Sequence, residues 1–87
     1  MATAEDVAKW MMEQVEQRYM YQDTIVYQIR SQFGEQFTYV NENGNLAIGK
    51  DVLKAFKKLS GDSVIWERGD RCWRKRRPYD RPGRQQD

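Results

Sequence analysis

Cationic side chains are the residues of this sequence best suited to chemistry, and most of them lie in its second half. Residues 1–62 carry seven Lys/Arg and nine Asp/Glu, a net charge of −2, whereas residues 63–87 carry eight and four, a net charge of +4. Local positive charge attracts polyanions, and lysine and arginine bind nucleic-acid phosphates without reading the base sequence. The candidate contact residues are Lys50, Lys54, Lys57, Lys58, Arg68, Arg71, Arg74, Lys75, Arg76 and Arg77. The alternative is that these cations only solvate a helix surface and a tail.

The residue types that most enzymes need are missing. The chain contains no histidine, which excludes histidine-based triads, metal sites and proton shuttles. Cys72 has no histidine to activate it, and the six glycines form neither GxxxxGK[ST] nor GxGxxG. We therefore expect a non-enzymatic protein without a cofactor.

Length and composition indicate one small soluble domain. The chain has 87 residues, of which 39% are hydrophobic and 32% charged, and no apolar run approaches the roughly 18 residues that span a membrane. The N-terminus lacks the pattern of a secretory signal, and a lone cysteine fits a reducing compartment. We expect a cytoplasmic protein, no membrane partner, a domain over residues 1–76 and a flexible basic tail over residues 77–87.

Two helices are predicted first. Thr3 and Asp6 resemble a helix N-cap and its acidic partner, and apolar residues recur every fourth position over residues 4–19. Gln22 or Asp23 starts a second helix, for which Asp23 is a reasonable N-cap and which Gly34 ends. The apolar side chains on these helices are Val7, Met11, Val15 and Tyr19, then Ile25, Val26, Ile29 and Phe33.

The segment after Gly34 is rich in turn residues. Residues 37–40 suggest a short strand, and Asn43-Gly44 signals a tight turn. Residues 46–48 either pair back as a hairpin or lead into the next helix. Three alternating asparagines resemble calcium ligands, but only Glu42 in the loop is acidic and no bidentate glutamate ends it, so we expect no metal site.

A third helix and a hairpin complete the predicted domain. Val52, Leu53, Phe56 and Leu59 form an apolar stripe over residues 50–59, with four lysines opposite. Residues 63–67 and 71–75 can pair across a two-residue Gly69-Asp70 loop of the primed type. That register places Trp66 opposite Trp73, Glu67 opposite Cys72, and Ile65 opposite Arg74. The tryptophan face should be buried.

The order helix, helix, short strand, helix and terminal hairpin "VIWERGDRCWRKR" is similar to the winged-helix architecture of the helix-turn-helix superfamily. The resemblance covers residues 4–76 and implies an α+β fold: three helices with a short strand and a C-terminal two-stranded β-hairpin. The stretch "GEQFTYVNENGNLAIG" is longer than a helix-turn-helix turn. The runs "FGEQFTYVNENGNLAIGKDVLKAFKKL" and "VIWERGDRCWR" also resemble a small family of unknown function, which implies no site residues.

Two functions fit this sequence. By fold analogy, helix 50–59 and the basic hairpin would bind DNA weakly and nonspecifically, because the helix offers lysines but no Arg, Asn or Gln to read bases. Alternatively, Trp10, Tyr21, Tyr79 or the arginine tail would dock a protein partner, since these residue types are enriched at binding hot spots.

Overall fold

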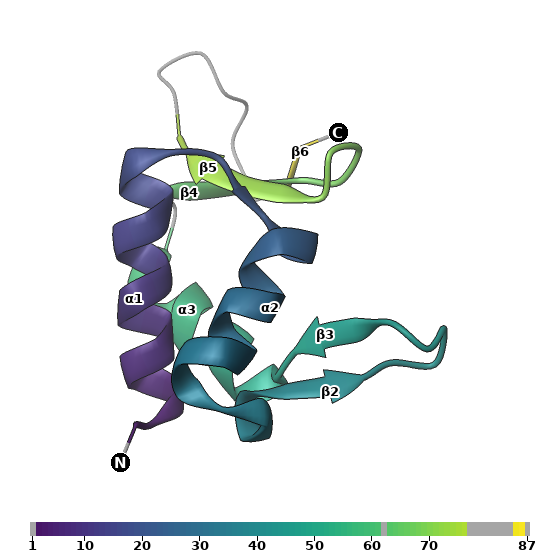
Figure 1. The fold of residues 1–87 in the computed structure, drawn as a ribbon. Helices are drawn as coiled ribbons and strands as arrows, with labels where there is room; N and C mark the ends of the chain where they lie inside the picture. Colours follow the sequence, from purple (N-terminus) through teal and green to yellow (C-terminus); the bar gives the residue numbers. More distant parts are fainter. Residues whose placement is uncertain (1, 62, 77–84, 87) are drawn as a thin grey trace.

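Three helices and two small sheets form the fold, which a computed structural model describes for residues 2–61, 63–76 and 85–86 (Figure 1). The elements are α1 (Ala4–Gln17), β1 (Met20–Tyr21), α2 (Gln22–Phe33), a 3₁₀ turn (Glu35–Phe37), β2 (Thr38–Val40), β3 (Leu46–Ile48), α3 (Lys50–Ser60), β4 (Val64–Glu67), β5 (Cys72–Lys75) and β6 (Gln85–Gln86). The α+β class, the three helices and the C-terminal hairpin are confirmed.

Helix α1 begins as the sequence predicts and ends earlier. The Thr3 hydroxyl accepts a hydrogen bond from the Asp6 N–H at 3.2 Å, and the Asp6 carboxylate accepts one from the Thr3 N–H at 2.9 Å. This capping box satisfies two of the N–H groups that a helix start leaves open. The helix stops at Gln17 because Arg18 is extended, with φ −163° and ψ 173°. Tyr19 therefore lies outside the helix, where it is exposed.

Strand β1 turns the chain from α1 into α2 and was not predicted. Met20 pairs with Trp73 and Tyr21 pairs with Cys72, so β1 joins the terminal hairpin antiparallel along β5. Helix α2 starts at Gln22 after Tyr21, which provides no side-chain cap. The expected Asp23 cap is wrong. Asp23 lies in the first turn, and its carboxylate is 3.5 Å from an Arg71 nitrogen.

Strands β2 and β3 form the smaller sheet, which settles the open choice in favour of a hairpin. Tyr39 pairs with Ala47 in the middle of the ladder. The Asn41 side-chain oxygen accepts hydrogen bonds from the N–H groups of Asn43 and Asn45, at 2.9 and 3.0 Å. The asparagines thus build the turn. In Figure 1 this hairpin extends away from the helices.

The terminal hairpin has the predicted register. Ile65 pairs with Arg74, Trp66 with Trp73 and Glu67 with Cys72, and the two indole centroids are 4.5 Å apart. The predicted primed turn is wrong, because the positive φ of 52° belongs to Arg71 and not to Gly69. Cross-strand aromatic pairing therefore sets the register without that turn.

The main core lies between the helices and one face of the hairpin sheet, whose strand order is β1-β5-β4-β6. Helix α3 packs against α1, and the Phe56 ring meets the Trp73 ring edge-on at 5.7 Å. The buried residues around them are Val7, Ala8, Met11, Val15, Met20, Ile25, Val26, Ile29, Ile48, Val52 and Val64. This packing fixes α3 and the hairpin relative to each other.

Most of the predicted C-terminal tail lies outside the residues that the structure describes. Residues 77–84 and 87 lie outside them, so the expected tail is represented only by Gln85–Gln86, which pair with β4 in parallel. No helix within the described segments is both long and apolar enough to cross a membrane.

Candidate nucleic-acid interface

The four lysines of α3 form one continuous row. Val52 and Phe56 are buried on the inner side of the helix, and Lys50, Lys54, Lys57 and Lys58 are all exposed. Successive residues of a helix are separated by about 100°, so these lysines fall within roughly 100° of arc and extend along about 12 Å of the helix. None of them forms an ion pair with another described residue. We call them the α3 lysine row.

Helix stability explains part of this row. Lys57 and Lys58 lie in the last turn, where positive charge complements the helix dipole, and Asp51 lies in the first turn, where negative charge does. Lys50 is different, because it is the first residue of the helix and places its charge against the dipole. The helix therefore gains nothing electrostatically from Lys50.

A shallow groove lies beside the lysine row, between α3 and the start of α1. Its volume is about 680 Å³, and its lining includes Lys54, Lys57 and Lys58 together with Glu5 and Asp51. The two carboxylates would repel a phosphate within the groove. The exposed ridge of lysines is therefore better suited to a polyanion than the groove.

Arg74 differs from the expectation that it contacts phosphates. It is only 5% exposed, and its Nε donates a hydrogen bond to the Glu67 carboxylate. Its Nη1 also donates to the Lys75 carbonyl at 3.1 Å. A charge this deeply buried needs a partner, so Arg74 belongs to the hairpin's internal structure.

The remaining hairpin cations divide between the two ends of the hairpin. Arg68 and Arg71 lie in the tip, and Arg71 approaches Asp23. Lys75 is 3.0 Å from the Glu16 carboxylate. The half-buried Arg76 donates its backbone N–H to Ser63, which in turn bonds to the end of α3. Arg77 lies outside the described residues.

The hairpin also brings three potential metal ligands together, and they do not suit a metal. Ligand atoms of Glu67, Asp70 and Cys72 lie within 4.8 Å of one another. Burial, reinforced by the nearby carboxylates, raises the pKa of the Cys72 thiol. A protonated thiol is a poor ligand and a poor nucleophile, and Glu67 already binds Arg74. The cluster fits an ion pair beside a buried thiol.

The comparisons with known proteins give a family and no activity. The Family of unknown function (DUF6953) matches residues 3–75, which is most of the chain. No curated protein and no solved structure matches. The matched segment runs from the N-cap of α1 to the last residue of β5. The chain therefore belongs to the Family of unknown function (DUF6953).

Proposed function

We propose that this protein is a non-enzymatic, winged-helix-like module that binds DNA weakly through its phosphates. The observation that carries the proposal is the α3 lysine row, with four exposed cations on one helix face and no ion pair to a described residue. Over the same 12 Å or so, duplex DNA carries about seven phosphate charges, since each occupies about 1.7 Å of axis. The row is long enough to meet several of them.

The arrangement of the hairpin supports this proposal. Three helices are followed by a two-stranded hairpin, and β1 ties that hairpin to the segment between α1 and α2. The Arg76 N–H donates to the Ser63 carbonyl, and the Ser63 N–H donates to the carbonyl of Ser60, the last residue of α3. These bonds connect the end of the hairpin to the end of the helix that carries the lysine row. Arg74 no longer belongs to the proposed contact set.

The position of β2 and β3 argues against sequence-specific recognition. A helix-turn-helix joins its two helices through a turn of three or four residues, whereas here a hairpin stands between α2 and α3, and α3 packs mainly on α1. The lysines also lack the planar donors that read base edges. We expect affinity without sequence preference.

Titration of the full chain with a short DNA duplex tests the proposal. At about 50 mM salt, NMR amide signals of α3 should shift, and binding should weaken with a log–log salt slope near −3.6 if the four lysines act alone. The double variant Lys54→Gln/Lys57→Gln should lower the magnitude of the slope by about 1.8. The matched control Lys9→Gln/Arg30→Gln removes two charges from α1 and α2 and should leave the slope unchanged. Absence of shifts at low salt would eliminate the proposal.

A protein-binding role has weaker support. Tyr19, Tyr21, Tyr27, Tyr39, Val40 and Leu59 are exposed. They are spread over β1 and its approach, α2, β2 and α3, with at most two on each. Trp10 packs against Phe33 with ring centroids 5.5 Å apart, and Tyr79 lies outside the described residues. The lysine row is the more coherent surface.

A further inference from the structure

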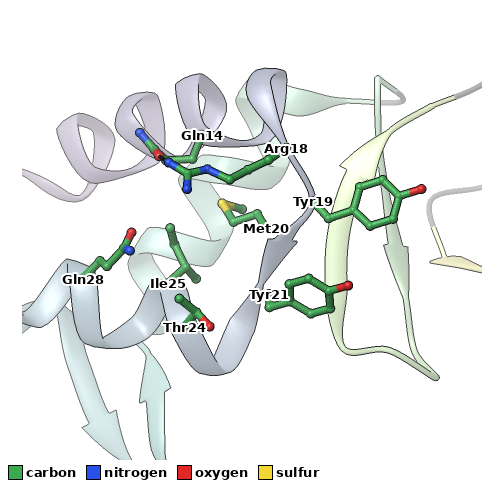
Figure 2. Close-up of a pocket in the computed structure, with 8 residues that line it drawn as sticks. All are labelled: Gln14, Arg18, Tyr19, Met20, Tyr21, Thr24, Ile25 and Gln28. Carbon is green, nitrogen blue, oxygen red and sulfur yellow. Dashed lines mark hydrogen bonds between the residues drawn. The ribbon is translucent and has the colours of Figure 1, made fainter.

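A cavity between the end of α1 and the start of α2 has a lining that the nucleic-acid proposal does not use. The chain passes from α1 into α2 through only four residues, Arg18 to Tyr21, and the two helices leave a space of about 260 Å³ beside this turn. Its walls and floor include Gln14, Arg18, Met20, Thr24, Ile25 and Gln28 (Figure 2). The lining residues are thus close together in the sequence, and they come from the end of α1, from β1 and from the first turns of α2.

The polar residues of this cavity come in two pairs, one at the end of α1 and one on α2. Gln14 and Arg18 lie one turn apart at the end of α1, and Thr24 and Gln28 lie one turn apart on α2. The Arg18 guanidinium donates to the Gln14 side-chain oxygen at 3.1 Å. This bond holds Arg18 over the cavity and leaves the Gln14 amide hydrogens free to donate.

Charge on the cavity wall is of one sign. Arg18 is the charged residue of the lining, no carboxylate lines the cavity, and Arg18 forms no ion pair with a described residue. The partial negative charge at the C-terminal end of α1 lies next to it. A guanidinium fork beside amide and hydroxyl donors matches the several lone pairs of a carboxylate.

The floor of the cavity is apolar. Met20 and Ile25 lie at the bottom and are only 3% and 4% exposed. The Tyr19 and Tyr21 rings point to the other side of β1, as Figure 2 shows, so they do not fill the space. An anion that uses this floor must carry an apolar group next to its charge. A free phosphate would leave the floor uncovered, and its double charge exceeds the single charge of Arg18.

We propose that this cavity binds a small carboxylic acid, with the carboxylate on Arg18 and its amide and hydroxyl neighbours and the apolar group on Met20 and Ile25. The volume equals that of roughly nine water molecules at about 30 Å³ each, which admits an acid with a short branched chain and excludes a nucleotide. This site is separate from the α3 lysine row. The carboxylate that binds there belongs either to a free small acid or to the C-terminal end of a peptide.

Amide-detected NMR titration with 3-methylbutanoate tests this site in the full chain. We expect saturable shifts at Arg18, Thr24 and Gln28, and no such shifts with the neutral analogue 3-methylbutanamide. Arg18→Gln should weaken binding at least about tenfold, because it removes a charge-assisted hydrogen bond. Thr24→Tyr should also abolish binding by filling the space while it keeps the charge. Arg30→Gln removes an equal charge from α2 outside the cavity and should bind normally.

Several results separate the proposal from simpler explanations. Equal shifts from the acid and the amide, unchanged affinity in Arg18→Gln, or no saturation at about 50 mM acid would each overturn it. A spectrum of each variant without ligand checks that it folds. Binding of acetyl-leucine, which carries the carboxylate at a peptide end, would extend the site to chain ends, and binding of 3-methylbutanoate alone would restrict it to free acids. Either outcome supports carboxylate recognition.

Discussion

Replacement of Glu67 by alanine would test whether Arg74 is an internal ion-pair partner. The Arg74 side chain is 6% exposed and the Glu67 side chain 22%. Removal of one partner from a buried pair costs about 3–5 kcal/mol, since the other charge stays in a poorly solvated place. Water reaches part of Glu67, so we expect the lower end of this range. A loss of about 3 kcal/mol lowers Tm by about 12–24 °C in a domain of this size.

The matched controls separate burial from simple loss of charge. Glu16→Ala breaks the exposed pair with Lys75, whose side chains are 57% and 56% exposed, and should cost less than about 1 kcal/mol. The double variant Glu67→Leu/Arg74→Met replaces both partners by apolar groups and should be far more stable than Glu67→Ala. Urea unfolding followed by tryptophan fluorescence, with thermal melts followed by circular dichroism, measures all three. Equal losses from Glu67→Ala and Glu16→Ala would refute the internal role of this pair.

Two further predictions concern ionisation. The backbone N–H of Thr3 bonds to Asp6 and lowers the pKa of that carboxyl, so the contribution of Asp6 to stability is present above its unfolded pKa and is lost as pH falls through the folded pKa. Thr3→Ala should destabilise the protein by about 1 kcal/mol at neutral pH. When the free energy of unfolding is measured against pH for wild type and for Asp6→Asn, the two curves should converge at low pH. Burial raises the pKa of the Cys72 thiol, so a thiol reagent should label native protein far more slowly than urea-unfolded protein at pH 8, and equal rates would contradict its burial.

Elements with a long or chemically marked pattern were predictable from the sequence. Helix α3 repeats its apolar residues over three turns, and its predicted bounds differ from the observed ones by a single residue. The capping box of α1 is visible in the spacing of Thr3 and Asp6. The pairing of Trp66 with Trp73 follows from two indoles that must share a buried face. In each case local preference and core packing favour the same structure.

Elements that depend on tertiary contacts were not predictable. Strand β1 has two residues, too few for a period of two, and exists because β5 offers it an edge. Asp23 has the right type for an N-cap, but α2 begins one residue before it, once the chain leaves β1. The cavity depends on the angle at which α1 and α2 meet on either side of this strand, so no sequence pattern indicates that Arg18 and Thr24 line the same cavity.

The sequence also overestimates the charge available for binding. The Arg74 side chain follows Trp73 in the chain and so points to the opposite face of the sheet, where Ile65 and Cys72 are fully buried. On that buried face Arg74 needs the Glu67 carboxylate as a partner. The charge of Arg74 is therefore used within the fold and is not available to a phosphate. Arg71 and Lys75 also have carboxylate partners, but those pairs are exposed, and a phosphate can replace either carboxylate at a cost below about 1 kcal/mol. The contribution of each cation to the proposed phosphate binding therefore depends on the free energy needed to separate it from its carboxylate partner. On that criterion the α3 lysine row comes first, Arg71 and Lys75 can be recruited, and Arg74 cannot.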